Sequence, residues 1–265
     1  MLTIDPKDIA TQKLYGLMVS TVGPRPIAFA STMNAEGKPN LAPFSFFNMM
    51  SANPPILVFS PVLKISDKSS KHTLQNVEQN KEVVINVVNY DIVQQMSLAS
   101  TAYAEGVNEF EKAGLTMQDA EVVKPYRVKE SPVQFECKVT QIVTLGEEGG
   151  AGHLVCCEVL KMHIADEVLD ENNKIDQFKL DQVSRMGGNL YSRANKGIFE
   201  IPKPISSMGM GVDALPESIR ESSVLTGNDL GKLGTLEAIP EEKEVEEFLS
   251  ENKLKEYVSE TSLEK

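Results

Sequence analysis

The segment PVQFECKVT, residues 132–140, alternates between apolar and polar side chains more regularly than any other part of the chain. A period of two predicts a strand with one buried and one solvent-facing side, because successive side chains of a strand point to opposite faces. GEEGGAG, residues 146–152, predicts a turn, and HLVCCEVLKMHI, residues 153–164, predicts a returning strand. The middle of this second strand is apolar on both faces. We therefore expect it to be covered on one side by the core and on the other by another element or subunit.

Other short apolar runs predict further strands. These runs are PIAFAST (26–32), LAPFSFF (41–47), ILVFS (56–60) and EVVINVV (82–88). MNAEGKPN lies between the first two and predicts a hairpin turn. HTLQNVEQN (72–80), DIVQQMSLAS (91–100) and VNEFEKAG (107–114) predict short helices, and we expect Asp91 to cap the second of them. Antiparallel strands with helical insertions predict a mainly β, barrel-like fold.

Beyond Ile205 the composition of the chain changes to a glycine-rich stretch that is typical of loops. EEKEVEEFLSENKLKEYV, residues 241–258, follows it. Val245, Phe248 and Leu249 are spaced i, i+3, i+4, which predicts an amphipathic helix. Such a helix docks one narrow apolar stripe, and the alternative is an acidic, partner-binding tail. We expect a domain over residues 1–204 and an extension over residues 205–265.

The charge balance excludes some partners. Lys and Arg number 26 against 38 Asp and Glu, a net charge of −12, which argues against nucleic acid because phosphate contacts need a basic face. The apolar runs are too short to span a bilayer, and MLTIDPKDIA carries acids where a signal peptide needs bases. We expect a cytoplasmic protein that binds neither nucleic acid nor membrane.

Few residues offer chemistry of their own. The histidines, at 72, 153 and 163, lack a ligand spacing, so no metal is expected. The cysteines, at 137, 156 and 157, lack a metal-like spacing and are expected to be reduced core residues. The glycines at 146–152 and 209–211 do not complete a dinucleotide fingerprint. With no nucleophile or acid–base pair found, a reaction would depend on a bound cofactor.

Two segments suggest which cofactor. APFSFFNMMSANPP, residues 42–55, places three phenylalanines around Ser45 and Asn48, which suits a flat heterocycle with a polar edge. SSKHTLQN places Lys71 and Thr73 at the start of a predicted helix, where a charge, a hydroxyl and free amides can meet a phosphate. A ring site and a phosphate site together indicate a flavin nucleotide.

The chain also resembles a known family. VGPRPIAFASTMNAEGKPNLAPFSFFNMMSANPPILVFSP, continued by KHTLQN and EVVINVV, is similar to the flavin reductase-like family, the flavoredoxin group of FMN-binding split barrels. The match runs from about Tyr15 to Pro204, and RMGGNLYSR (185–193) is similar to a later Arg-x-Gly-Gly segment of the family. The resemblance implies a six-stranded, antiparallel split β-barrel of Greek-key type with helical insertions and a C-terminal helical extension. It also implies a homodimer that holds FMN near the subunit boundary.

The resemblance assigns roles to particular residues. The segment Phe44, Ser45, Phe46, Phe47 and Asn48 would line the isoalloxazine, and Lys71 and Thr73 would face the phosphate. His72 stands where many relatives carry Asp, so this chain lacks the acid that those relatives have between the Lys and the Thr. The remaining cofactor-binding candidates are Arg185, Asn189 and Tyr191, which would close the site, together with Arg25 and Ser60. Arg25 has an alternative role as a structural donor to carbonyl groups, and no side chain is expected to be catalytic.

The function implied is that of an FMN-dependent oxidoreductase. NADH or NADPH would act as a transient hydride donor, and the reduced flavin would pass electrons to free flavin, a small acceptor or a protein. The alternative is an electron-transfer or non-catalytic FMN-binding protein without its own NAD(P)H oxidation. A pyridoxamine-phosphate oxidase-like enzyme is a further candidate, but the segment APFSFFN favours the flavin reductase-like family.

Overall fold

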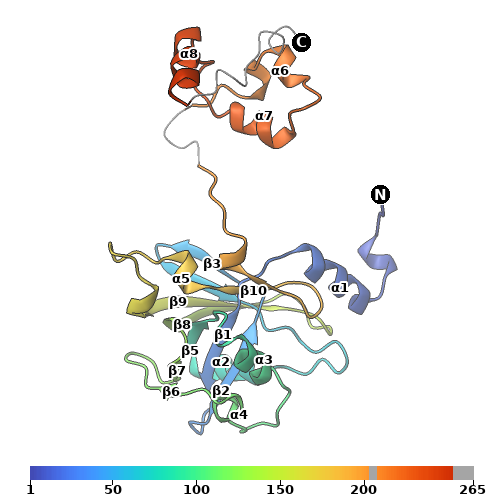
Figure 1. Cartoon of the computed structure of the whole chain (residues 1–265). Coiled ribbons are helices and arrows are strands. Elements are labelled where there is room, and N and C mark those ends of the chain that lie inside the picture. The colour runs from blue at the N-terminus through green and yellow to red at the C-terminus, as the bar shows by residue number, and fades with distance from the viewer. Residues whose placement is uncertain (203–207, 253–265) are drawn as a thin grey trace. The chain divides into compact units, whose positions relative to one another are not determined.

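The structure is a computed structural model that describes residues 1–202 and 208–252. The chain divides into two compact units, Met1–Ile198 and Phe199–Lys265. The first unit contains every strand of the described residues (Figure 1). The expected boundary at residues 204 and 205 falls in the segment 203–207, outside the described residues. Within the described parts of both units, no helix is long and apolar enough to cross a membrane.

A seven-stranded antiparallel sheet forms the first unit, in the order β2-β1-β5-β8-β9-β4-β3. The strands are β1 (Ala28–Met33), β2 (Pro39–Phe44), β3 (Phe47–Ala52), β4 (Pro55–Phe59), β5 (Glu82–Val87), β8 (Val133–Thr144) and β9 (His153–Ile164). The two edge strands, β2 and β3, follow each other in the chain with only Ser45 and Phe46 between them. The sheet must therefore curl until its edges meet, which gives a barrel with an open seam. The resemblance implied six strands, whereas this sheet has seven.

The inside of the barrel is the main hydrophobic core. Alternate residues of six strands meet there, because side chains of a strand face one side at every second position. Helix α2 (His72–Asn80) adds two apolar side chains to the same cluster. The cluster consists of Ala28, Ala30, Phe44, Leu57, Phe59, Leu74, Val77, Val83, Ile85, Cys137, Val139, Val155 and Cys157. The packing fixes α2 against the barrel, and with it the start of the helix.

A second cluster covers the outer face of β1 and β2. Phe29 and Leu41 meet apolar residues of α3 (Val93–Ala99) and α4 (Glu109–Ala113) there. Both helices were expected from the sequence. The predicted cap of α3 is wrong: Ile92 occupies the N-cap position, no side chain caps the helix, and the Asp91 carboxylate instead accepts from Asn89 at 3.5 Å. This cluster places the turn that follows α3 beside the start of α2.

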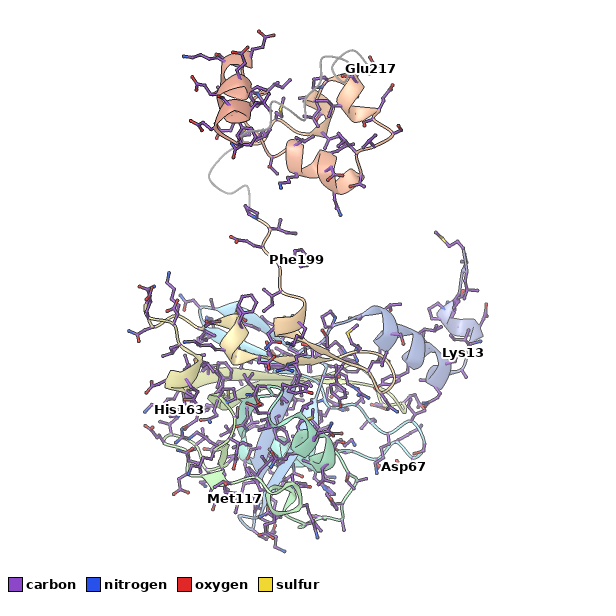
Figure 2. The ribbon with its side chains drawn as sticks, in the orientation of Figure 1. Lys13, Asp67, Met117, His163, Phe199 and Glu217 are labelled. Atoms are coloured by element: carbon purple, nitrogen blue, oxygen red, sulfur yellow. The ribbon has the colours of Figure 1, made fainter. Side chains whose placement is uncertain are left out.

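The polar side of β8 is buried at Gln134 and Glu136, contrary to the alternating pattern, whereas Lys138 and Thr140 are exposed as predicted. The segment between β6 (Met117–Gln118) and β7 (Arg127–Val128) covers the buried part. Glu136 is 0% exposed and accepts hydrogen bonds from the backbone N–H groups of Glu121 (2.9 Å) and Val122 (2.7 Å). Its Oε1 also lies 2.7 Å from Nε2 of His163, which Figure 2 labels. Burial alone would raise the pKa of Glu136, but these hydrogen bonds outweigh it and lower the pKa.

Strand β9 shows a clear difference between its two halves. Val155 and Cys157 are buried in the core, whereas Leu160 and Met162, at and beyond a register shift in the pairing with β8, remain 48% and 43% exposed. Within the described part of this single chain, the second half of the strand is therefore only partly covered. The cysteines are free, as expected, but only Cys137 and Cys157 are buried in the core, and burial raises the pKa of the Cys137 thiol to about 12.

Shorter elements complete the first unit. They are η1 (Pro6–Asp8), α1 (Thr11–Thr21), η2 (Asp166–Val168), α5 (Gln177–Leu180), β10 (Val183–Arg185), β11 (Tyr191–Arg193) and η3 (Ala194–Lys196). Strands β10 and β11 form a two-stranded hairpin. The hairpin is joined to the segment before β1 through an antiparallel bridge between Arg25 and Arg185. This bridge brings a late part of the chain to the end of β2.

The second unit is helical in its described residues. It contains η4 (Val212–Ala214), α6 (Glu217–Arg220), α7 (Gly227–Leu233) and α8 (Glu242–Glu251). The predicted amphipathic helix is present as α8, and the rest of its predicted span, from residue 253, lies outside the described residues. Val245 and Phe248 on its apolar stripe are 43% and 58% exposed. The stripe is thus largely uncovered within the described part of this unit.

Candidate functional site

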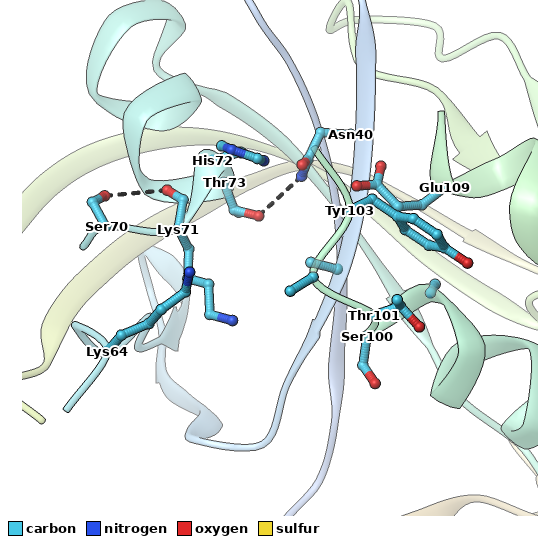
Figure 3. Close-up of a pocket in the computed structure, with 13 residues that line it drawn as sticks. Asn40, Lys64, Ser70, Lys71, His72, Thr73, Ser100, Thr101, Tyr103 and Glu109 are labelled. Atoms are coloured by element: carbon cyan, nitrogen blue, oxygen red, sulfur yellow. Dashed lines mark hydrogen bonds between the residues drawn. The ribbon is translucent and has the colours of Figure 1, made fainter. Parts of the chain in front are cut away.

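A polar pocket lies at the start of α2 (Figure 3). Lys71 is the N-cap residue, and no side chain caps this helix. The first N–H groups of a helix have no partner within the helix and carry partial positive charge. Lys64 and Lys71 line the same pocket on one side, while Tyr103 and Glu109 line it on the other. Two ammonium groups and free amides at one point make an anion-binding site.

A chain of buried amides and hydroxyls holds the start of α2 in place. Nδ2 of Asn40 donates to Oγ1 of Thr73 at 3.0 Å and approaches Oγ1 of Thr32 at 3.3 Å. Nδ2 of Asn76 donates to the same Thr32 oxygen at 3.0 Å. Because Thr73 accepts from Asn40, its own hydroxyl hydrogen is available to donate toward the pocket. Thr73 therefore anchors the helix and leaves a hydroxyl hydrogen that could donate to an anion in the pocket.

Glu109 is the one carboxylate that lines this pocket. It is 6% exposed, and its Oε2 accepts the backbone N–H of Leu41 at 3.0 Å. Burial raises its pKa, although that hydrogen bond and the nearby His72 act in the opposite direction. Asn108 caps α4 and thereby places Glu109 at the first position of the helix. A carboxylate in this place offers an acceptor to a hydroxyl group of a ligand.

A second pocket, of about 160 Å³, lies at the end of β2. Its lining combines apolar side chains, two serine hydroxyls, a guanidinium and a phenol. The residues are Ile27, Pro43, Ser45, Met96, Ser100, Arg185 and Tyr191. Ser100 also lines the first pocket, so the two pockets adjoin. Among the predicted residues, the structure thus gathers Lys71, His72 and Thr73 in one pocket, and Ser45, Arg185 and Tyr191 in its neighbour.

Arg25 is a structural residue, as its alternative role suggested. It is 7% exposed and lines neither pocket. Its guanidinium donates to the carbonyl oxygens of Val19 (2.6 Å), Val22 and Met186 (2.9 Å). Burial lowers its pKa, and the nearby charge of Arg185 lowers it further. Arg25 therefore joins the segments that support the second pocket, and its Nε donates to Oγ of Ser45, which lines that pocket, at 3.4 Å.

The phenylalanines of residues 44–47 also lie away from both pockets. Phe44 is buried in the barrel core against Phe59, with ring centroids 5.3 Å apart, and Phe47 packs against the same core. Phe46 lines a separate apolar cavity beside α1 and meets Tyr15 edge-to-face at 6.2 Å. The expectation that these three rings wall a heterocycle does not match their positions. In this segment, only Ser45 lines the second pocket.

Three further candidates lie elsewhere. Asn48 is exposed on the edge strand β3, where its side chain accepts from the N–H of Met49. Ser60 is buried, and its N–H donates to the carbonyl of Phe46 at 2.8 Å. Asn189 is exposed in the turn between β10 and β11. None of the three lines either pocket.

Several lining residues were missed at the sequence level. Two of them, Lys64 and Ser70, precede α2 closely enough that a local search around the helix start could have found them. The others come from distant parts of the chain. The missed residues of the two pockets are Asn40, Ala42, Lys64, Ser70, Ala99, Ser100, Thr101, Ala102, Tyr103 and Glu109, with Ile27, Pro43 and Met96.

The chemistry of the two pockets is that of ligand binding and not of a metal centre. Within residues 1–202 and 208–252, no group of three or more His, Cys, Asp or Glu could hold a metal ion. The model of the flavin reductase like domain matches residues 21–179. The chain belongs to this family. The structural neighbours include split-barrel flavin reductases, which confirms the predicted fold.

Individual relatives agree with this assignment. An uncharacterised protein of Aquifex aeolicus is 38% identical over 188 residues, which cover 71% of this chain and 93% of that protein. The solved structure of nitrilotriacetate monooxygenase component B from Bacillus cereus has a TM-score of 0.71 at 29% identity, covering 76% of this chain and 98% of its own. That of the Pseudomonas fluorescens 2-nitrobenzoate 2-nitroreductase NbaA has a TM-score of 0.67 at 26% identity, with 77% and 98% covered. These similarities indicate a flavin-related oxidoreductase.

Proposed function

We propose that this protein binds FMN and acts as an NAD(P)H-dependent flavin reductase. The observation that carries the proposal is the anion site at the start of α2 adjoining a second pocket through Ser100. An anion site beside a partly apolar pocket suits the phosphate and the ring system of one flavin nucleotide. When bound, FMN would supply the redox chemistry, taking hydride from a nicotinamide and releasing electrons to an acceptor.

The residues at the first pocket fit the phosphate end of that cofactor. Lys64 and Lys71 supply positive charge, and the hydroxyl of Thr73 supplies a directed donor. The buried Glu109 would repel a phosphate placed beside it, but it can accept from a ribityl hydroxyl. We therefore assign the phosphate to the side of Lys64 and Lys71.

The residues at the second pocket position a ring and exclude water from it. Ile27, Pro43 and Met96 supply apolar surface, while Ser45 and Ser100 supply hydroxyls for a polar edge. The lining contains no carboxylate or histidine that could act as a general acid or base. Direct hydride transfer needs neither, so the protein contributes alignment of the reactants.

The acceptor of the electrons belongs to the proposal as well. One neighbour is named as component B of a monooxygenase and another as a nitroreductase. These names support free flavin, a protein partner or a small organic acceptor as the consumer of the electrons. Steady-state assays with each class, at fixed donor concentration, would rank them.

The binding part of the proposal is tested by the absorption spectrum of the purified protein and the mass of the released cofactor. We expect a yellow protein that releases FMN. A colourless protein that fails to bind added FMN would refute the proposal. Release of FAD alone would refute the assignment of a monophosphate to the α2 pocket.

A further inference from the structure

Arg185 brings an uncompensated positive charge to the second pocket. Its guanidinium lies over the ring of Tyr191, 4.5 Å from the centroid, and donates to the carbonyl of Gly188. Within the described residues, no carboxylate lies within 4.0 Å of it.

Arg193 on the same hairpin shows the contrast. It also stacks on a tyrosine, with its guanidinium 3.7 Å from the centroid of Tyr90. Unlike Arg185, it is paired with a carboxylate, that of Asp181, at 2.5 Å. The charge of Arg193 is satisfied inside the protein, while that of Arg185 is available to a ligand.

The backbone that carries Arg185 is held firmly. Its N–H donates to the carbonyl of Arg25 at 2.8 Å, and the N–H of Arg25 donates to its carbonyl at 3.0 Å. The Arg25 side chain binds the next residue, Met186, at its carbonyl. The backbone of Arg185 is thus fixed beside the pocket. A fixed position lowers the cost of ordering the side chain when a ligand binds, which favours a role for Arg185 in ligand recognition.

We propose that Arg185 recognises a phosphate group of the dinucleotide hydride donor and so sets the affinity for that donor. This inference rests on the proposed function. The phosphate of the flavin is assigned to Lys64 and Lys71 in the first pocket, which leaves Arg185 for the second substrate. A guanidinium can bind a phosphate through two parallel N–H groups, and the Tyr191 ring orients its plane.

The test compares Arg185→Gln with the unaltered protein, using two kinds of hydride donor. Loss of a charge-assisted contact should raise the KM for NADH or NADPH about tenfold to hundredfold, with kcat changed much less. The neutral donor 1-benzyl-1,4-dihydronicotinamide has no phosphate, so its kcat/KM should fall far less than that of NADH or NADPH. Arg185 lines the pocket assigned to the flavin ring, so the affinity for FMN is measured as well and should change less than the KM for NADH or NADPH.

Salt and matched variants sharpen the test. Salt screens the attraction between charges, so the KM of the unaltered protein for NAD(P)H should rise with ionic strength more steeply than that of Arg185→Gln. Arg185→Lys keeps the charge without the planar fork and should recover part of the affinity. Lys196→Gln removes a unit charge from η3, outside the pocket. This control should leave the kinetic constants for both kinds of donor unchanged.

Each outcome has a distinct meaning. Equal losses with the charged and the neutral donor, in a variant that binds FMN and melts normally, would overturn the role of Arg185. An FMN complex weakened by as much as the KM for NADH or NADPH rises, in both Arg185 variants, would also overturn it, because it would place Arg185 at the cofactor. An unaltered protein that binds FMN but oxidises neither donor would refute the proposed function and this inference together.

Discussion

The charge of Lys71 gives the most direct residue-level prediction. Lys71→Ala should weaken FMN about tenfold to hundredfold, because a charge-assisted hydrogen bond contributes roughly 1.5 to 3 kcal/mol. Riboflavin lacks the phosphate and should lose little affinity. Lys112→Ala, an exposed lysine on α4, is the matched control. Fluorescence titration measures both ligands, and equal losses for FMN and riboflavin would place Lys71 away from the phosphate.

The buried carboxylate of Glu136 gives a prediction about acid stability. Its lowered pKa means that it stabilises the fold above its ordinary value of 4.5, and that this contribution is lost as the pH falls through the lowered pKa. Glu136→Gln should lower the free energy of unfolding at pH 7 by roughly 2 to 4 kcal/mol. The difference from the unaltered protein should shrink below pH 4.5.

Denaturant unfolding from pH 7 to pH 3 measures this difference. The exposed Glu171 provides the control, since Glu171→Gln should follow the unaltered protein across the range. A Glu136→Gln variant whose deficit stays constant down to pH 3 would show that the carboxylate charge is not what the surrounding N–H groups stabilise.

Residue-level inference from the sequence placed residues correctly where the cause is local. Lys71 and Thr73 were predicted to lie together at a helix start, and both line one pocket there; their role in binding remains a proposal. The burial of Glu136 was missed because a segment 14 to 15 residues earlier in the chain covers it. Glu109 was missed for a similar reason, since its partner Leu41 is 68 positions away.

At the scale of elements, the attachment of α2 to the β1–β2 hairpin determines the phosphate pocket. Asn76→Ala removes the nearer of the two amides that donate to the buried Thr32 hydroxyl and leaves that of Asn40, at 3.3 Å. This should cost about 1 to 3 kcal/mol of stability. FMN should also bind more weakly, because the helix start is less firmly held.

Thermal unfolding and FMN titration of the same variant separate these effects. Glu78→Ala, on the exposed side of α2, should change stability by less than about 0.5 kcal/mol. An Asn76→Ala protein with full stability and full FMN affinity would show that the buried amides do not position α2.

The sequence predicted most elements of the barrel, but not how the chain passes from one edge to the other. LAPFSFF was expected to be one strand, whereas β2 ends at Phe44 and β3 begins at Phe47. The break moves the chain from one edge of the sheet to the opposite edge. Alternation of side chains carries no signal for this change, because it depends on the curl of the whole sheet. The positions of Phe46 and Phe47 could not be predicted for the same reason.

At the scale of the whole molecule, the exposed apolar side chains in the second half of β9, Leu160 and Met162, support the proposal of a homodimer. Light scattering should give twice the 29.1 kDa mass at micromolar concentration. The double change Leu160→Glu and Met162→Glu should shift the protein toward the monomer, because each introduces a charge at an exposed apolar position. A flavin-loaded monomer of the unaltered chain would contradict the proposal.

The C-terminal extension is tested separately. A chain that ends at Ile239 lacks α8 and its exposed apolar stripe. Its mass by light scattering and its affinity for FMN report what α8 contributes. A dimer with unchanged FMN affinity would show that α8 is not needed for either, and would leave the dimer proposal intact.

The central claim, that the protein oxidises a nicotinamide through bound FMN, is tested most directly by anaerobic reduction of the FMN-loaded protein. NADH and NADPH are added separately, and the visible flavin absorbance is followed in a stopped-flow spectrometer. We predict that at least one of them bleaches the flavin at a rate no slower than steady-state turnover. A stoichiometric amount of acceptor should then restore the absorbance. Flavin that dithionite bleaches but neither nicotinamide reduces would contradict the account and identify an electron-transfer or non-catalytic flavoprotein.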